Sequence, residues 1–279
     1  MIDWLQALIL GIVQGLTEYL PVSSSGHLEI FKDILGVDLP AEENLQFSVI
    51  LHAATVLSTI VVLWPMFRRL CVSFFTWKRD ADFYYVCKLL VSAIPVAIVG
   101  FFFKDAVEEI FASSLTVVGV CLCVTAALLI FAHMSGIQAA KNGKIMFKSA
   151  SAGREISWWD AVIIGCAQAV AVLPGLSRSG TTIATGIMLG DKRDKVASFS
   201  FLMVIIPILG EALLDVKKML EPANAAAAKA EALPMAVGFL AAFIVGCLAC
   251  KWMISLVNKG KLYWFALYCV VVGVICILW

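Results

Sequence analysis

The sequence predicts an all-α polytopic membrane protein with a single membrane domain, residues 1–279. The domain is expected to consist of two inverted repeats, each a re-entrant helix hairpin plus three transmembrane helices. Three observations support this fold class. The chain is 62% hydrophobic and only 15% charged, with a mean hydropathy of +0.96, whereas soluble domains carry about 25% charged residues. Long apolar runs recur along the whole length, and a pattern of the first half returns in the second.

Apolar runs of membrane-spanning length fix the expected helices, since about 20 apolar residues cross a bilayer. Barrel strands would alternate instead. The candidate segments are Ile2–Leu20, Phe47–Trp64, Tyr85–Phe103, Leu115–His133, Trp158–Leu173, Ala197–Leu214, Leu233–Met253 and Leu262–Trp279. Two shorter segments rich in serine and glycine follow the first and the fifth of these, and they are Ser23–Leu35 and Ser179–Leu189.

Lys and Arg residues in the connections predict the orientation through the positive-inside rule. The basic connections, expected in the cytoplasm, are Phe67–Tyr84, Met134–Ser157, Asp191–Lys195 and Lys251–Lys261. The connections expected outside are Leu28–Gln46 and Lys104–Ser114, and by alternation also Asp215–Ala232, whose charges are mixed. The first and fifth apolar segments must then enter and leave on the same side. Each is therefore predicted to be a re-entrant hairpin.

An internal repeat appears when the chain is aligned with itself at one constant offset. The offset pairs Trp4 with Trp158, Gln14 with Gln168, and the Ser-x-Ser-Gly of residues 23–26 with that of residues 177–180. Matched Trp, Gln and Gly at one offset indicate an internal duplication, with repeat 1 at about residues 1–134 and repeat 2 at about 155–279. An odd number of full spans in each half inverts the second copy. The two polar turns, residues 21–27 and 174–182, are then expected to meet near the midplane of the membrane.

The first turn, in the stretch QGLTEYLPVSSSGH, collects hydrogen-bonding side chains inside an apolar segment. Gln14 and Glu18 are four residues apart and share a helix face. A charged residue in such a helix is unfavourable by about 2.5–3.5 kcal/mol on insertion scales, so Glu18 needs a partner or a function. Helix N-termini bind anions, phosphate above all, which suits a helix capped by Ser23. His27 could then reach Ser24 or a ligand beside it.

The remaining groups of the first turn are the side chain of Ser25 and the backbone of Gly26, which would allow a ligand to come close. The second turn reads PGLSRSGTT, with Arg178 in the place of Ser24 and Thr181 in that of His27. Guanidinium groups suit phosphate oxygens. The expected hydroxyl donors beside Arg178 are Ser177, Ser179, Thr181 and Thr182, and Gly180 corresponds to Gly26. An Arg178–Glu18 ion pair could also hold the two hairpins together.

Other polar residues give weaker signals. His52 and His133 are interpreted as packing or interfacial residues, and Glu211 as a weak candidate for lining a cavity. The nine cysteines lie mostly in apolar stretches and are interpreted as small packing residues, with no zinc site. The net charge of +1 argues against a nucleic-acid partner. The sequence leaves the oligomeric state open.

The two turn sequences and the later FSFLMVIIPILG resemble the signature regions of the bacterial undecaprenyl-diphosphate phosphatase family, the BacA-type enzymes of bacitracin resistance. Length and hydropathy match as well, so the resemblance covers nearly the whole chain. Many members of that family have a glutamate at the position of Gln14. Glu18 is therefore expected to act without a second carboxylate.

The resemblance implies hydrolysis of undecaprenyl diphosphate to undecaprenyl phosphate and phosphate, at the outer side of the bacterial cytoplasmic membrane. It also implies a divalent cation, Mg²⁺ or Ca²⁺. Carried over by position, it makes four residues catalytic, and these are Glu18, Ser24, His27 and Arg178. The implied substrate-binding residues around them are Gln14, Ser23, Ser25, Gly26, Ser177, Ser179, Gly180 and Thr181.

The expected mechanism leaves alternatives open. Arg178 and the amides of the turns hold the diphosphate, and Ser24 or His27 attacks the terminal phosphorus, or His27 activates the attacking group. Glu18 either orients His27 or is a metal ligand. The main rival class is a transporter or flippase of a lipid phosphate, since inverted repeats with broken helices are typical of transporters. A phosphatidic-acid-type phosphatase would need a histidine where this chain has Ala184.

Overall fold

The computed structural model describes residues 2–103, 115–141, 153–173, 175–210 and 232–279. Within these ranges the chain consists of helices and turns and contains no β-strand, so the predicted all-α fold is confirmed there. Three helices are long and apolar enough to cross a membrane, and a fourth span arises if one bent helix pair is counted as one. Glu211 and the connections 104–114 and 215–231 lie outside the described residues.

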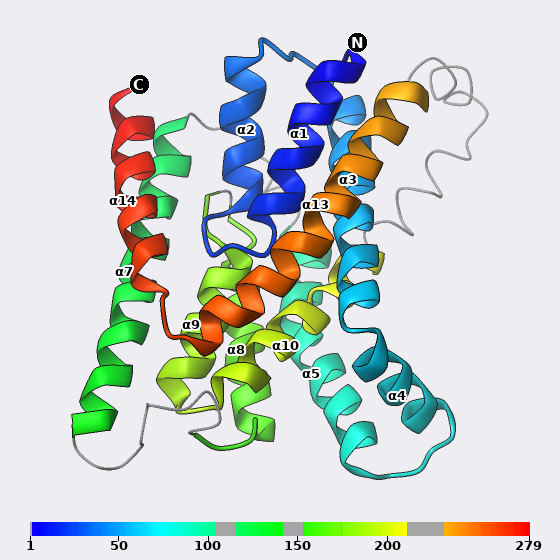
Figure 1. Ribbon diagram of the computed structural model, residues 1–279, viewed down its shortest axis with the longest axis vertical. Coiled ribbons are helices and arrows are strands. Elements are labelled where there is room, and N and C mark those ends of the chain that lie inside the picture. Colours follow the sequence, from blue (N-terminus) through cyan, green and yellow to red (C-terminus); the bar gives the residue numbers. More distant parts are fainter. Residues whose placement is uncertain (1, 104–114, 142–152, 174, 211–231) are drawn as a thin grey trace.

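Two helical hairpins occupy the centre of the molecule. The first consists of α1 (Trp4–Thr17) and α2 (Ser24–Ile34), and the second of α8 (Trp158–Val170) and α9 (Arg178–Leu189). Figure 1 shows the first hairpin descending from the end of the molecule that carries both termini, and the second rising from the opposite end. Their turns meet about halfway. The two apolar segments predicted to be re-entrant, Ile2–Leu20 and Trp158–Leu173, therefore each form a helix that leads into one of these turns.

The first helices of the two hairpins, α1 and α8, both begin with a capping box. Asp3 precedes α1, and its carboxylate accepts hydrogen bonds from the amides of Leu5 and Gln6. Ser157 precedes α8 and accepts from the amide of Asp160, whose carboxylate accepts from the amide of Ser157. Such capping boxes satisfy amides that have no partner at a helix start. They fix where each hairpin enters the bundle.

The second helices of the hairpins, α2 and α9, are short and rich in polar residues, and residues at their ends explain where they begin and end. Both are preceded by a serine cap, Ser23 and Ser177. The helix α9 ends at Gly190, whose φ of 89° is the left-handed conformation that glycine adopts without a side-chain clash. Segment 23–35 was predicted as such a short helix, and so was segment 179–189. Both predictions are confirmed by α2 and α9.

Two long helices lie against the hairpins on one side. α3 (Ala41–Val62) crosses the bundle and is followed by α4 (Trp64–Phe75), with a bend of 89° between them. The sequence analysis placed only a basic connection there and missed α4. Pro65 explains the bend, because proline is favourable in the first turn of a helix and cannot continue a preceding one. α5 (Ala81–Phe102) starts at the capping residue Asp80 and packs on α8.

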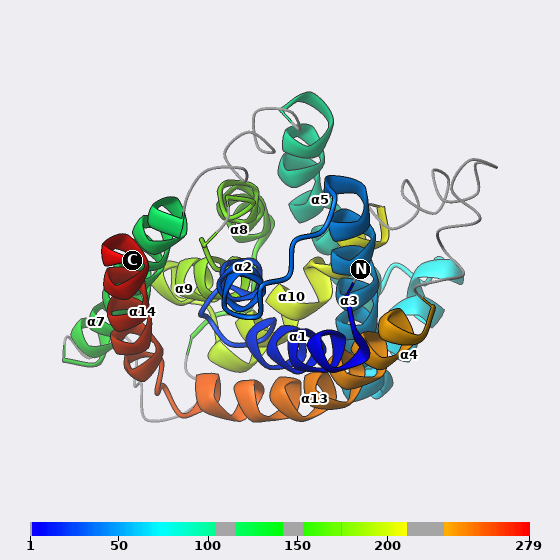
Figure 2. The same ribbon diagram turned by 90° about the horizontal axis from the view of Figure 1, so that it is seen from above.

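Three further helices complete the bundle, and small residues let them approach closely. α13 (Ala232–Asn258) lies along α1, with Gly11 and Gly15 directly against its backbone. α7 (Leu115–Lys141) pairs with α14 (Tyr263–Leu278), where Gly119 faces Gly273. Helices in membranes associate through such small-residue interfaces. Figure 2 shows the hairpins at the centre, with α7 and α14 at one side, α3 and α5 at the other, and α13 along α1.

The predicted span Ala197–Leu214 is interrupted. The helix α10 (Arg193–Met203) includes only the first seven residues of that span, and the chain is helical again over residues 205–210. Pro207 accounts for the break, because it has no N–H to donate to the carbonyl of Met203. The interruption sets the residues that follow α10 close to the turns of the hairpins.

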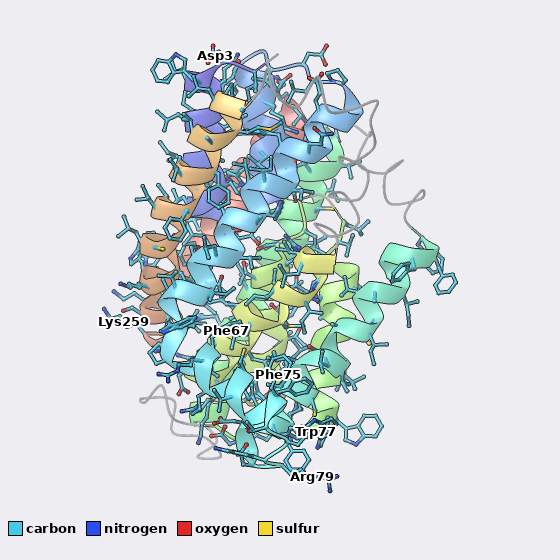
Figure 3. The ribbon with its side chains drawn as sticks, turned by 90° about the vertical axis from the view of Figure 1, so that its right-hand side faces the viewer. Asp3, Phe67, Phe75, Trp77, Arg79 and Lys259 are labelled. Atoms are coloured by element: carbon cyan, nitrogen blue, oxygen red, sulfur yellow. The ribbon has the colours of Figure 1, made fainter. Side chains whose placement is uncertain are left out.

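Charged residues lie at the two opposite ends of the molecule. Figure 3 places Asp3 at one end and Arg79 at the other. At the end of Arg79, the base of the second hairpin is closed by Arg154, whose backbone bonds to Gly190 and Lys192 and whose guanidinium donates to Asp160 at 2.6 Å. Asp191 lies 3.5 Å from the same guanidinium and is buried. Burial, with the adjacent charge of Asp160, raises the pKa of Asp191 to about 7.

Candidate active site

The two turns are capped in the same way. The hydroxyl of Ser23 accepts a hydrogen bond from the amide of Gly26 at 3.2 Å, and that of Ser177 accepts from the amide of Gly180 at 3.1 Å. The predicted cap at Ser23 is confirmed. The amides of both glycines are consequently engaged, and among the turn amides expected to face a ligand, that of Gly26 is not available.

Gly26 and Gly180 serve close packing between the turns. A Cβ atom on Gly26 would lie 3.0 Å from a methyl of Val118 and 3.2 Å from the Cα of Gly175. On Gly180 it would lie 3.1 Å from Pro21 of the opposite turn. The hydroxyl of Ser179 adds a direct hydrogen bond from the second turn to the carbonyl of Leu20 in the first, at 3.1 Å. The sequence-predicted turns are thus in contact.

Glu18 is the centre of the polar groups at this junction. Its Oε2 atom accepts hydrogen bonds from the side-chain amide of Gln14 at 2.8 Å and from the hydroxyl of Ser24 at 2.7 Å. Gln14 reaches it because the two residues lie one helical turn apart, as the spacing predicted. Ser24 reaches it because the turn folds α2 back beside the end of α1. The side chain of Glu18 retains 10% of its accessible surface.

Arg178 faces the same carboxylate from the second hairpin. Its Nη2 atom lies 3.4 Å from Oε1 of Glu18, and its side chain keeps 24% of its accessible surface. Because Arg178 is the first residue of α9, the positive end of the helix dipole lies at the same place. A guanidinium and a helix N-terminus together form a binding site for an anion such as phosphate.

His27 is not part of this group, which corrects the hypothesis that Glu18 orients it. Its Nδ1 atom lies 2.8 Å from the carbonyl oxygen of Ser23, and its Nε2 atom 2.7 Å from the hydroxyl of Tyr268 on α14. A carbonyl only accepts, so Nδ1 carries a proton and Nε2 accepts from the tyrosine. The ring also stacks on that of Tyr268. Among the contacts of the described residues, none links His27 to Glu18 or to Ser24.

The imidazole next to Glu18 belongs instead to His52, which the sequence analysis interpreted as a packing or interfacial residue. Its Nε2 atom lies 3.7 Å from Oε2 of Glu18. The sequence did contain a signal for it. His52, Thr55 and Thr59 recur at helical spacing along α3 and form a polar stripe in its mostly apolar second half.

Tyr19 connects α3 to the first turn and so brings His52 into place. The hydroxyl of Tyr19 contacts the carbonyl of Thr55 at 2.6 Å, the hydroxyl of Thr59 at 2.9 Å and that of Ser58. Its ring packs edge-on against Phe201 of α10. Since Tyr19 directly follows Glu18 in the chain, these contacts fix the position of the carboxylate relative to α3.

A small cavity opens beside Glu18 and Arg178. Its lining divides into a polar part and an apolar part. The polar part includes Thr55, Thr59, Ser179 and Ser200, and the apolar part is formed by Val56, Phe201, Val204, Ile205 and Ile208. Such a lining suits a molecule with an anionic head and a hydrocarbon tail.

Several buried polar atoms near the turns have no hydrogen-bond partner among the residues that the structure describes. They include the hydroxyls of Ser200 and Thr181 and the side-chain oxygen of Gln14. Buried polar groups are satisfied in nearly all proteins, so these atoms mark places where a ligand or water completes the structure. Ser200 lines the cavity and was not predicted as a site residue, although it lies in the stretch FSFLMVIIPILG.

The sequence is similar to known proteins over nearly its whole length. The family model described as "Bacitracin resistance protein BacA" matches residues 7–275. An undecaprenyl-diphosphatase of Parabacteroides distasonis is 54% identical over 99% of this chain and 97% of its own length. Proteins with the same name from Bacteroides fragilis and Oceanobacillus iheyensis are 53% and 36% identical, with at least 93% of each sequence covered.

Proposed function

The chain belongs to the BacA family of bacitracin resistance proteins, and from this premise we propose the function of its site. The protein is a multi-pass membrane enzyme, an undecaprenyl-diphosphatase that removes the terminal phosphate of undecaprenyl diphosphate. The observation that carries this function is the cavity in which Arg178 and Glu18 adjoin an apolar wall from α3 and the residues after α10.

In the proposed complex, the guanidinium of Arg178 and the N-terminus of α9 hold the diphosphate. The lipid chain leaves along the apolar side of the cavity, past Val204 and Ile208. The unpartnered hydroxyl of Ser200 donates to a phosphate oxygen. Each of these groups contacts the part of the substrate that matches its own polarity, which orients the diphosphate toward the first turn.

Ser24 is the nucleophile that the geometry favours. Its hydroxyl already donates a hydrogen bond to Glu18, which can take the proton as the oxygen attacks the terminal phosphorus. The bond from that phosphorus to the bridging oxygen breaks and releases undecaprenyl phosphate. Water then hydrolyses the phosphoserine. His27, with both ring nitrogens engaged, has a structural role in this proposal: it attaches the first turn to α14.

A divalent cation is implied by the family resemblance, with Glu18 as a candidate ligand. Glu18 is the only carboxylate in the lining of the cavity, and the described ranges contain no group of three His, Cys, Asp or Glu residues arranged to bind a metal. A cation at Glu18 would also face the guanidinium of Arg178. These residues do not fit a resident metal ion. We propose that a Mg²⁺ or Ca²⁺ ion arrives bound to the diphosphate, as part of the substrate.

The site is proposed to act at the outer side of the bacterial cytoplasmic membrane. Support comes from the charges at the two ends, because the basic connection containing Arg79 lies opposite Asp3 (Figure 3) and basic ends face the cytoplasm. The first hairpin, which carries Glu18 and Ser24, then enters from outside. Adding substrate to the exterior of sealed vesicles tests this, provided that protease accessibility of the basic connections gives the orientation of the protein.

The function is tested by phosphate release from undecaprenyl diphosphate by the purified protein in detergent, with Mg²⁺ and with EDTA. Arg178→Ala should lower the rate by roughly 100-fold or more, as for other transition-state donors. Arg79→Ala, at the distant end of the molecule, is the matched control and should keep the rate. A folded wild type that binds the lipid but releases no phosphate would contradict the function.

That negative result would favour the rival function, a transporter or flippase of a lipid phosphate. The observation in its favour is the meeting of two hairpins from opposite ends of the bundle (Figure 1), which is typical of transporters. Movement of undecaprenyl phosphate between the leaflets of protein-containing vesicles, without phosphate release, distinguishes the two functions.

A further inference from the structure

The environment of His52 differs from that of the other histidine near the turns. Its Nδ1 atom lies 2.7 Å from the carbonyl oxygen of Ser48, one helical turn earlier on α3. The carbonyl accepts, so Nδ1 carries a hydrogen. The opposite nitrogen, Nε2, therefore points its lone pair, or a second N–H, at Oε2 of Glu18, 3.7 Å away.

Oε2 of Glu18 already accepts hydrogen bonds from Gln14 and Ser24, so it does not need a hydrogen from the imidazole. In the neutral ring, Nε2 carries a lone pair and no hydrogen. At 3.7 Å from the carboxylate, this nitrogen is placed to receive a proton that Glu18 takes up. The pair is thus arranged to share one proton, in a site where the side chain of His52 keeps 17% of its accessible surface.

The charged groups around the pair are few. Glu18 lies between His52 of α3 and Arg178 of α9, within ion-pair distance of both. The helices that pack on α3 are α1, α4 and α13, and their other charged side chains within the described residues are Arg68, Arg69 and Lys251. The two arginines lie beyond the bend of 89°, and Lys251 is exposed near the end of α13. The site therefore contains one carboxylate, one guanidinium and one imidazole.

We propose that His52 is the proton acceptor of Glu18 during phosphate hydrolysis, a positioning residue that acts through this carboxylate. The inference rests on the proposed function and deepens it. When Ser24 attacks, its proton passes to Glu18 and on to Nε2 of His52, while the phosphorus–oxygen bond to the lipid phosphate breaks. Glu18 thereby becomes a carboxylate again and is ready for the second step.

In that step water attacks the phosphoserine, and Glu18 takes a proton from the water and returns one to the departing oxygen of Ser24. The imidazolium of His52 releases its proton to solvent. One proton is thus produced with each phosphate, which balances the conversion of a lipid diphosphate and water into a lipid phosphate and inorganic phosphate. Imidazole suits this task because it gains and loses a proton near neutral pH.

The test measures kcat and KM for undecaprenyl diphosphate across about pH 5 to 9 in the purified full-length protein. His52→Gln and His52→Asn both remove the titrating group. Asn retains a donor that can face Ser48, and Gln retains one that can face Glu18, so at least one of them should fold. The matched controls are His133→Gln, far from the site, and His27→Gln, the histidine favoured by sequence alone.

In the wild type, kcat should decrease toward acid pH (an acid limb of the pH profile), because an imidazole that already carries the proton cannot accept one from Glu18. The His52 variants should lose kcat by at least roughly 10-fold at neutral pH, with KM within about 2-fold, and should lose the acid limb. His133→Gln should keep the limb. An acid limb that persists in both His52 variants, or that disappears in His27→Gln instead, overturns the inference. Phosphate release by the wild type establishes the function in either case.

Discussion

The guanidinium of Arg178 lies 3.4 Å from the carboxylate of Glu18, although the two residues belong to different hairpins that enter from opposite ends of the molecule. The carboxylate neutralises the arginine while no anion is present. When a diphosphate binds, the arginine can turn to it, and Glu18 retains the hydrogen bonds of Gln14 and Ser24. The pair therefore serves both the stability of the empty site and the binding of substrate.

Replacing Glu18 by glutamine should affect both the reaction and the stability of the site. Glu18→Gln preserves the shape of the side chain but removes the base for Ser24, so kcat should fall by roughly 100-fold or more. The protein should also lose stability, because Arg178 loses the charge that neutralises it, although an amide oxygen can still accept from Gln14 or from Ser24. The rate is measured as phosphate release, and the midpoint of thermal unfolding (Tm) by tryptophan fluorescence. Glu29→Gln is the control, since Glu29 is a partly exposed carboxylate on α2 that pairs with Lys32, and equal rates in the two variants would refute the assignment.

Ser200→Ala tests whether the unpartnered hydroxyl in the cavity contacts the substrate. The variant breaks no hydrogen bond within the protein, so its Tm should not fall. Loss of one bond to a charged phosphate should raise KM by about 10-fold, or roughly 1.5 kcal/mol. Ser198→Ala removes a hydroxyl that bonds to the carbonyl of Asp194 on the same helix and should leave KM unchanged. An unchanged KM in Ser200→Ala removes this residue from the proposed site.

The sequence predicted the parts of the fold that local rules determine. The serine cap at Ser23 and the shared face of Gln14 and Glu18 follow from residue type and spacing alone, whereas the cap at Ser177 was not predicted. The helix α4 was missed because its charged residues resemble a connection, and Pro65 was not weighed as a helix start. The break after Met203 was missed because Pro207 lies inside an apolar run. The duplication of the sequence itself remains a prediction.

The sequence could not rank the histidines, because their roles depend on distant contacts. His27 lies in the motif, but its ring nitrogens are engaged by Ser23 and by Tyr268, which is far away in the sequence. His52 reaches Glu18 only because Tyr19 attaches the first turn to α3. Neither relationship is visible in spacing along one helix.

Close contact between the turns should make Gly26 intolerant of a side chain. Gly26→Ala introduces a methyl about 3.0 Å from Val118 and close to Gly175, and such overpacking lowers stability by about 1–3 kcal/mol. Activity should fall as well, since the turn carries Ser24. Gly100→Ala is the control, because no atom of another described part of the chain lies within 4 Å of its Cβ position and alanine favours the helix. Its Tm should be equal or higher, and a similar loss in both variants would argue against turn packing as the cause.

The last prediction concerns the base of the second hairpin, where Asp160 and Asp191 share Arg154. Burial and the charge of Asp160 raise the pKa of Asp191 to about 7 in the folded protein, against about 3.9 in an unfolded chain. The folded state therefore binds more protons between these two values. The stability that this group provides is present below about pH 4 and is lost as the pH rises through about 7.

Asp191→Asn should abolish this dependence, because the amide stays neutral. At about pH 5 the variant and the wild type should have similar Tm values. At about pH 8 the variant should unfold several degrees higher, since the wild type then buries an ionised carboxylate beside Asp160. Asp80→Asn is a control in which the pH dependence of stability is reversed. Hydrogen bonds from Ser73 and Phe83 lower the pKa of Asp80, so the stability that the Asp80 carboxylate provides is lost at acid pH. A Tm difference between Asp191→Asn and wild type that is the same at both pH values would show that Asp191 is already ionised at pH 5.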